Sequence, residues 1–306
     1  MTRYVARLPG KRIRPALALL AAGIAKTKKQ TRRGQTPQAG QGSDPSVRLA
    51  AAAEMIHTAT LLHDDVIDGA SLRRGLSTLN AKWGDTLSVL SGDYLYSKAF
   101  CLLSGLEDQQ VLNLMSNTAR TVCEGEVAQI QHQYDLSLSI ARYLEIIQWK
   151  TASLMSACTQ CGALLGGASE SEAQGLKAFG LNFGLAFQIM DDTQDLVGEE
   201  EAAGKSLGTD LGTGQLTLPL LYLRDASGPQ AREALSRWFD GNGSLDADAN
   251  REILSFLKEE AFRHQVPDTC RTIAQDYLKT GRLALSVFPD SPFKESLFSL
   301  TDYLLS

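Results

Sequence analysis

The chain has 306 residues, a formal net charge of −5 and 43% hydrophobic residues. The negative overall charge does not favour binding to nucleic acid, and no apolar stretch of about 18 residues is present that could span a membrane. The first residues lack the apolar core of a signal peptide. Five scattered cysteines, an odd number, are typical of a reduced protein, so a cytoplasmic location is expected.

Apolar residues recur at helical spacing along the chain, and β-branched runs with a period of two are almost absent. This pattern predicts an all-α protein. No segment has the composition of a domain linker, so residues 1–306 are expected to form a single domain. The expected helices cover residues 12–25, 46–67, 79–104 (as one or two helices), 108–134, 139–166, 171–195, 215–225, 229–239, 249–264, 267–287 and 291–305.

Two segments interrupt the helical pattern. Residues 26–46 begin with Lys and Arg and continue with Gly, Gln, Pro and Ser, which predicts a flexible loop. Such a basic loop is expected to stay in solvent, and peripheral contact with an anionic membrane is the alternative. At its end, Asp44-Pro45 supplies an N-cap and a first-turn proline for the next helix. The glycine-rich segment from Gly198 to Gly214 predicts a mobile loop, and residues 69–77 predict a turn.

The sequence Asp-Asp-x-x-Asp occurs twice, at residues 64–68 and 191–195, each time at the end of an apolar helical run. Positions i and i+4 share a helix face, so Asp64 with Asp68 and Asp191 with Asp195 are expected to form two pairs of carboxylates. Neighbouring carboxylates raise one another's pKa unless a cation lies between them. One copy is weak evidence, because acidic helix ends are usually solvated, but two copies after apolar runs indicate a Mg²⁺ site. They also indicate an antiparallel bundle whose two acidic helices face each other across a cavity.

Basic residues occur near both acidic motifs. Lys11 and Arg14 lie one helical turn apart, and His57 precedes Asp64 by two turns on the same face. The remaining basic positions are Arg73, Arg74, Lys150 and Lys205. Each one alone is an ordinary surface charge, and a lone histidine on an apolar helix is usually a core residue. Together they favour phosphate binding, because Lys and Arg match phosphate oxygens. The pattern predicts two bound polyanions, one held through metal ions and one held by basic side chains.

Cys158-x-x-Cys161 has the spacing of a metal or redox motif. It lies inside an expected helix, and neither a second cysteine pair nor a histidine pair accompanies it. We therefore interpret both cysteines as small apolar residues of the core.

Eight motifs occur in a characteristic order. They are Gly10-Lys11-x-x-Arg14-Pro15, His57 to Asp65, Arg73-Arg74-Gly75, Gly92-Asp93-Tyr94-Leu95, Gly125-Glu126-x-x-Gln129, Lys150-Thr151-Ala152, Gly184 to Asp192, and Gly204-Lys205 to Leu211. Over residues 9–305 the chain resembles the all-trans polyprenyl diphosphate synthases, in particular long-chain enzymes of the octaprenyl and solanesyl type. The resemblance implies an isoprenoid synthase type I fold, with helices around a central cavity, and a homodimer.

The resemblance also implies a reaction and its residues. Isopentenyl diphosphate is condensed onto an allylic diphosphate, with up to three Mg²⁺ held by Asp64, Asp68 and Asp191 and supported by Asp65, Asp192 and Asp195. Arg73, Lys150, Gln188 and Lys205 would bind the allylic diphosphate. Lys11, Arg14, His57 and Arg74 would bind isopentenyl diphosphate. Thr151 and Gln188 would direct their dipoles at the allylic carbocation, since the chemistry needs electrostatic stabilisation and no protein nucleophile.

The length of the product is expected to depend on the wall of the cavity below Asp64. Ala59 and Thr60 lie about one turn below it, and in this family a bulky aromatic there ends growth early. Both are small, which predicts a long product of about C35 to C50, of the kind used for quinone side chains. Met115, on the helix over 108–134, is placed near the lower end of the tunnel, with ordinary core packing as an equal alternative.

The chain departs from the family pattern in two places. Gln215 stands where the family usually has a lysine, and fewer residues than usual precede Lys11. Three alternatives therefore stay open. They are a short-chain (farnesyl or geranylgeranyl) diphosphate synthase, a partner subunit of a two-component synthase, and a class I terpene cyclase. The small Ala59 argues against the first, and the two intact acidic motifs argue against the others.

Overall fold

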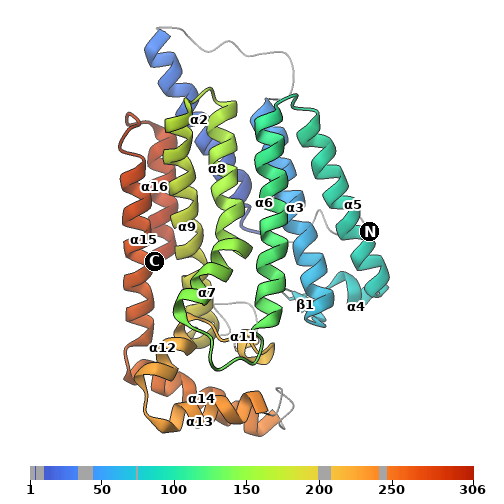
Figure 1. The fold of residues 1–306 in the computed structure, drawn as a ribbon, viewed down its shortest axis with the longest axis vertical. Coiled ribbons are helices and arrows are strands. Elements are labelled where there is room, and N and C mark those ends of the chain that lie inside the picture. The colour runs from blue at the N-terminus through green and yellow to red at the C-terminus, as the bar shows by residue number, and fades with distance from the viewer. Residues whose placement is uncertain (1–3, 5–9, 34–43, 74, 199–207, 241–246) are drawn as a thin grey trace.

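The computed structural model describes residue 4 and residues 10–33, 44–73, 75–198, 208–240 and 247–306. Within these ranges the chain is an all-α bundle with one two-stranded hairpin (Figure 1). The helices are α2 (Ile13–Arg33), α3 (Pro45–Ile67), α4 (Leu79–Trp83), α5 (Asp85–Ser104), α6 (Gln109–Gln131), α7 (Ile140–Ile147), the π-helix η1 (Gln148–Ala152), α8 (Ser153–Leu165), α9 (Glu170–Val197), α11 (Thr209–Gly212), α12 (Leu218–Ala226), α13 (Pro229–Asp240), α14 (Ala247–Arg263), α15 (Val266–Ala284) and α16 (Pro292–Leu305). The all-α prediction is confirmed.

Polar caps fix the beginning of several helices. The Asp44 side chain accepts a hydrogen bond from the Ser46 backbone N–H, and Pro45 opens α3, as the sequence predicts. Asp108 accepts one from the Val111 N–H at the start of α6. Ser169 and Glu172 form a reciprocal capping box at the start of α9. These caps satisfy N–H groups that have no partner within the helix, so the helix starts are encoded locally.

The prediction that residues 26–46 form a flexible loop is wrong for its first part, because α2 continues to Arg33. Lys and Arg are good helix formers, and residues 26–33 contain neither glycine nor proline. Lys28 also has fixed partners, since its ammonium lies 2.8 Å from a Glu172 carboxylate oxygen and 5.0 Å from the centre of the Phe288 ring. Residues 34–43 lie outside the described part, as do Gly241 to Gly243 and residues 199–207 of the predicted glycine-rich loop.

Two further segments differ from their expected form. Residues 69–77 contain a hairpin, with β1 (Leu72–Arg73) antiparallel to β2 (Leu76–Ser77). The single helix expected over 139–166 is three consecutive pieces, α7, η1 and α8. Periodicity did not reveal η1, because a single π-turn of five residues inside a longer apolar segment is too short to be distinguished from an α-helix.

Two glycines allow η1 to pack against its neighbours. A Cβ on Gly125 of α6 would lie 2.5 Å from the Lys150 backbone nitrogen. A Cβ on Gly184 of α9 would lie 2.5 Å from the Ala152 Cα. Neither position has room for a side chain, so the backbones of α6 and α9 hold η1 from two sides.

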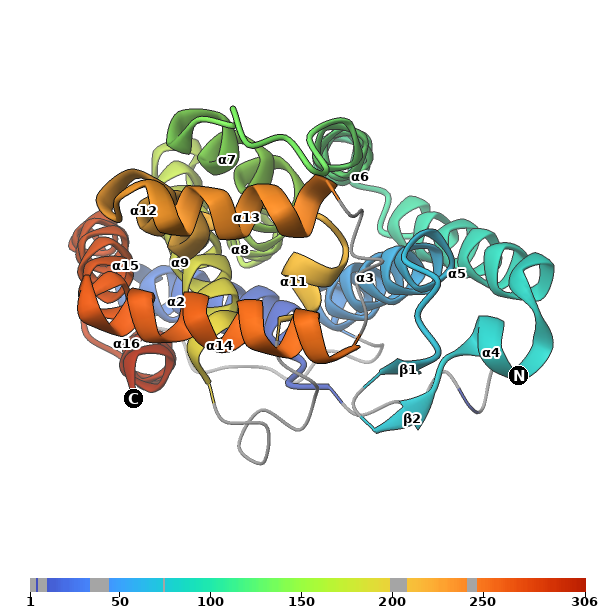
Figure 2. The same cartoon turned by 90° about the horizontal axis from the view of Figure 1, so that it is seen from below.

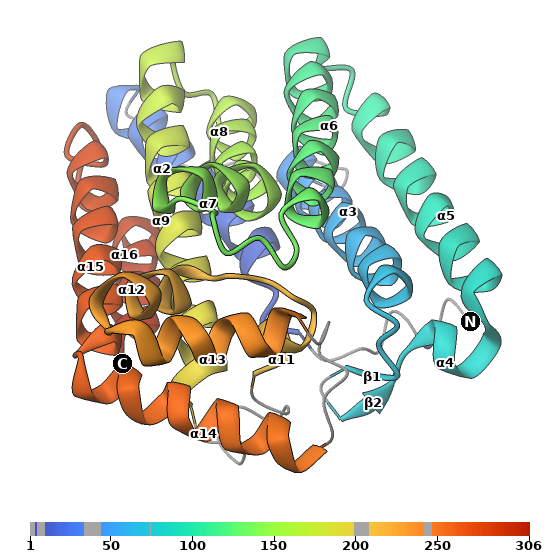
Figure 3. The ribbon, with the colours of Figure 1, turned by 60° about the horizontal axis from the view of Figure 1, so that its bottom comes forward.

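The acidic motifs lie at one end of the bundle. Helices α3 and α9 run in the same direction and finish at the lower end in Figure 1. Helices α13 and α14 cross this end, as the view from below shows (Figure 2). The hairpin lies beside it, next to α4 (Figure 3). Residues far apart in the sequence therefore meet at the end of the bundle where both motifs occur.

None of the helices in the described ranges combines the length and the apolar character that crossing a membrane would require.

Replacing Gly125 with alanine should destabilise the protein by about 2 kcal/mol, because the new methyl group overlaps the backbone of η1. Thermal unfolding of the variant measures this loss. Gly105→Ala is the matched control, since its nearest contact would be an ordinary 3.5 Å to the Cys101 carbonyl oxygen. Equal stability of the two variants would contradict the close packing of η1 on α6.

Candidate active site

The first acidic motif ends α3, and its three carboxylates differ in exposure. Asp65 is buried and accepts a hydrogen bond of 2.7 Å from Nε of Arg73 on the hairpin. Asp64 is half-buried, and Asp68 is the exposed C-cap of the helix. Asp65 therefore holds Arg73 in place, while the other two carboxylates accept no hydrogen bond from a donor among the described side chains.

Lys150 lies among the carboxylates of α3 and α6. It forms an ion pair with Glu126, and Asp64 and Asp68 interact with it electrostatically. Burial disfavours the Lys150 ammonium, but the charges of Asp64 and Glu126 outweigh burial, so the pKa of Lys150 is raised. Lys150 thus remains positively charged beside the first motif.

Burial raises the pKa of Asp64 to about 7, against the attraction of Lys150 and with added repulsion from Glu126. Burial also raises the pKa of Asp68. Burial therefore disfavours the ionised form of both carboxylates. A cation would stabilise the ionised form of these carboxylates, so the residues fit a hard metal ion with oxygen ligands.

The second motif lies within α9 and takes part in a chain of hydrogen bonds. The Thr151 hydroxyl donates to the Gln188 side-chain oxygen at 2.8 Å, and the Gln188 amide donates to Asp192 at 2.6 Å. The Tyr143 hydroxyl donates to the other Asp192 oxygen. Asp192 is buried, and this burial raises its pKa to about 7 despite the two donors.

The two outer carboxylates of the second motif lie in different surroundings. Asp195 is 2% exposed and accepts a hydrogen bond of 3.0 Å from the Asp210 backbone N–H. It thereby fixes the start of α11. Asp191 is exposed. The two carboxylates predicted to act as a pair therefore differ in exposure, since Asp195 is buried next to α11 and Asp191 is not.

Lys150 and Thr151 are adjacent in η1 and reach different motifs. Lys150 interacts with Asp64 and Asp68 of α3, whereas Thr151 contacts Gln188 and through it Asp192 of α9. The π-helix therefore connects the two acidic motifs and brings a cation and a hydroxyl between them.

The basic segment before α2 has an unusual backbone. Arg12 has a φ of 51°, a left-handed conformation that costs a non-glycine residue about 1–2 kcal/mol. Its guanidinium forms an ion pair with Glu54 of α3. Side chains that are 44% and 19% exposed make such a pair worth at most about 1 kcal/mol. The free energy gained from the ion pair therefore does not exceed the cost of the left-handed backbone at Arg12.

The other predicted diphosphate ligands are placed as follows. Lys11 is exposed, and its ammonium lies 5.9 Å from the centre of the Phe187 ring, next to Gln188. Arg14 is half-buried on α2, and His57 is half-buried on α3. The two helices are in contact with each other. Arg74 and Lys205 lie outside the described residues. Gln215 is half-buried, and its backbone N–H donates to the Asp210 carbonyl at 2.8 Å.

The predicted chain-length residues are all within the bundle. Ala59 is fully buried but does not join the contiguous apolar core, whereas Met115 is part of that core. Thr60 is half-buried, and its hydroxyl donates to the His57 carbonyl at 2.8 Å. Cys158 and Cys161 are fully buried in α8, in line with their interpretation as core residues, and burial raises the pKa of Cys158 to about 12.

Sequence reasoning missed the roles of Glu126 and Tyr143. Glu126 belongs to one of the eight motifs, and its negative charge could have suggested a pair with Lys150. Tyr143 gave no such signal, because it reaches Asp192 only through the packing of α7 against α9.

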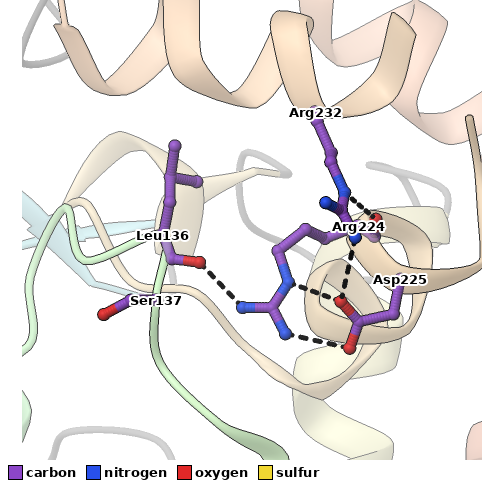
Figure 4. A pocket seen from close by; sticks show the side chains of 5 residues that line it. All are labelled: Leu136, Ser137, Arg224, Asp225 and Arg232. Carbon is purple, nitrogen blue, oxygen red and sulfur yellow. Dashed lines mark hydrogen bonds and ion pairs between the residues drawn. The ribbon is translucent and has the colours of Figure 1, made fainter. Parts of the chain in front are cut away.

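Arg224 of α12 holds the segment that leads into α7. Its Nη1 donates to the carbonyl oxygens of Leu136 and Leu138 at 2.8 and 2.7 Å. Its Nε and Nη2 donate to Asp225 on the wall of a hollow of about 350 Å³ (Figure 4). Arg224 therefore supports α7, and with it Tyr143, from outside the acidic centre.

We compared the chain with models of protein families, with known proteins and with solved structures. The family model described as Polyprenyl synthetase matches residues 1–257. The chain belongs to the polyprenyl synthetase family. It is therefore a trans-prenyltransferase.

Individual relatives cover nearly the whole chain. Octaprenyl diphosphate synthase from Escherichia coli is 36% identical over 97% of this chain and 86% of its own length. Geranylgeranyl diphosphate synthase from Methanosarcina mazei is 32% identical over 100% of this chain and 88% of its own. A polyprenyl synthase from Caulobacter crescentus, solved with calcium and isoprenyl diphosphate, is 38% identical with a TM-score of 0.86, over 97% of this chain and 85% of that one. The isoprenoid synthase type I fold is thereby confirmed.

Replacing Asp64 with asparagine should stabilise the metal-free protein at pH 8. The pKa of Asp64 is about 7 in the folded chain, above its ordinary value of 3.8, so the folded state binds this proton more tightly than the unfolded state does. The stability associated with Asp64 is complete below pH 4 and is lost as the pH rises through 7. Thermal unfolding should show a gain of several degrees for Asp64→Asn at pH 8, and the gain should vanish towards pH 4. Asp276→Asn, an exposed site, is the control, and equal behaviour of the two variants would contradict the cost of burying Asp64.

Proposed function

We propose that this enzyme condenses isopentenyl diphosphate head-to-tail onto an allylic diphosphate and forms a long-chain all-trans polyprenyl diphosphate of about C35 to C50. The observation that carries the proposal is the position of η1, which brings Lys150 and Thr151 to two separate acidic motifs. Two sets of carboxylates around a cation and a polar side chain suit a diphosphate that must be bound and then released.

Asp64, Asp68 and Asp191 are the proposed ligands of up to three Mg²⁺. They are the more exposed carboxylates of the two motifs, whereas Asp65, Asp192 and Asp195 are buried and already accept hydrogen bonds. In the described ranges, no three His, Cys, Asp or Glu side chains form a metal site by themselves. This suits Mg²⁺, which usually takes one or two carboxylates together with substrate phosphates and water. When bound, Mg²⁺ would neutralise charge on the diphosphate leaving group.

The protein's own groups would act on the same leaving group. Lys150 stays charged because Asp64 and Glu126 raise its pKa, and Arg73 is held by Asp65. Lys205, by family resemblance, would add a further cation. The Thr151 hydroxyl and the Gln188 side chain would direct their dipoles at the allylic carbocation left behind, since Asp192 and Tyr143 fix the orientation of Gln188.

Isopentenyl diphosphate would be held by Lys11, Arg14, His57 and Arg74. The bond from the allylic carbon to the diphosphate oxygen breaks first, and the isopentenyl double bond then attacks the allylic carbocation. A proton is then lost, and the departing diphosphate is the proposed acceptor. Gln215, in place of the usual lysine, would hydrogen-bond a phosphate without adding charge. The loss of one charge-assisted contact would weaken binding by about 1.5–3 kcal/mol.

A homodimer is proposed on the basis of an apolar stripe on α5. Leu87, Leu90 and Tyr94 are 41%, 56% and 51% exposed, and their spacing places them on one helix face. Helix α5 lies at the edge of the bundle (Figure 3). We also propose that the enzyme is cytoplasmic and that its product becomes the side chain of a quinone.

Incubation with Mg²⁺, labelled isopentenyl diphosphate and farnesyl diphosphate tests the function. Chromatography of the extracted prenols should show a ladder that ends at one long chain. A product that stops at C20 would establish the short-chain alternative, and a hydrocarbon formed from farnesyl diphosphate alone would establish a cyclase. No incorporation in excess Mg²⁺ would favour the partner-subunit alternative.

Replacing Ala59 with phenylalanine should shorten the product by several isoprene units, because the ring would fill the space one turn below Asp64. The same chromatography measures the product length. Ala59→Val is the smaller step and should shorten it less. An unchanged product length in an active Ala59→Phe enzyme would show that Ala59 does not line the path of the growing chain.

A further inference from the structure

The ion pair between Arg12 and Glu54 joins the two elements that carry the basic residues of the site. Arg12 lies between Lys11 and Arg14, directly before α2. Glu54 lies on α3, three residues before His57, so the two share a helix face. The pair therefore ties the segment with two predicted phosphate ligands to the helix with a third.

The backbone at Arg12 shows why such a tie is needed. Its left-handed φ of 51° turns the chain between Lys11 and the first residues of α2. Glycine adopts this conformation without strain, yet an arginine occupies the position. The exposed ion pair adds no more stability than the strained backbone removes. We therefore explain the arginine by the geometry of the turn that its side chain holds in place.

We infer that Glu54 and Arg12 are positioning residues for the isopentenyl diphosphate site, an inference that rests on the proposed function. Glu54 neutralises Arg12 and fixes the left-handed turn. Lys11 and Arg14 are thereby held at a set distance from His57. Neither Glu54 nor Arg12 needs to touch the substrate.

Steady-state kinetics with Glu54→Gln test the inference, because this change removes the charge and keeps the shape. The KM for isopentenyl diphosphate should rise about fivefold, while kcat and the KM for the allylic substrate stay within twofold. Arg12→Gly removes the same pair and relieves the backbone strain, so it should also raise this KM. The double variant should be no worse than the poorer single variant, because both changes break one interaction.

Glu124→Gln is the matched control. It breaks an exposed Arg–Glu pair with Arg120 within α6, which joins no two elements. It should leave all three kinetic constants unchanged. An unchanged KM for isopentenyl diphosphate in Glu54→Gln, or an equal rise in both KM values together with a lower melting temperature, would overturn the inference and leave only a structural role.

The wild-type protein separates failure of this inference from failure of the proposed function. Incorporation of labelled isopentenyl diphosphate by the wild type establishes the reaction, whatever the variants do. If the wild type shows no turnover, calorimetric binding of isopentenyl diphosphate alone compares the same variants. Weaker binding by Glu54→Gln and Arg12→Gly supports the inference, and equal binding, or no binding by the wild type, overturns it.

Discussion

The site depends on the close packing of η1 between α6 and α9. Gly125 and Gly184 have no side chains, so both helices approach the backbone of Lys150 and Ala152. Because consecutive residues of a helix point in different directions, the neighbouring Lys150 and Thr151 reach different motifs. An ordinary α-turn here would rotate one of these side chains away from its partner.

Burial divides the six carboxylates of the two motifs into two groups. Asp65, Asp192 and Asp195 are buried, and each orients another group: Arg73, Gln188 and the start of α11 respectively. Their hydrogen bonds offset part of the loss of water, although burial still raises the pKa of Asp65 and Asp192. The remaining three carboxylates, those of Asp64, Asp68 and Asp191, are more exposed and are the proposed metal ligands. Apparently equal aspartates of one repeated motif thus have different roles, and the difference follows from which neighbour packs against each one.

Two features near the predicted ligands lower the stability of the folded protein. Asp64 is held where burial and Glu126 favour its protonated form, although Lys150 opposes them. Arg12 similarly occupies a strained backbone conformation next to the predicted phosphate ligands. Both features lower the stability of the protein without ligands. Strain and unfavourable charge at functional sites are tolerated because bound ligands compensate for them.

The sequence by itself determined the all-α class, most helix starts and the family, because periodicity, caps such as Asp44 and ordered motifs are local properties of the chain. It also identified both acidic motifs. It did not reveal the continuation of α2 past residue 26, the π-helix, or the hydrogen bond from Tyr143 to Asp192. Those depend on partners distant in sequence, such as Glu172 for Lys28. Which aspartates are buried and which are exposed was likewise decided only by tertiary packing, since burial depends on residues that are distant in sequence.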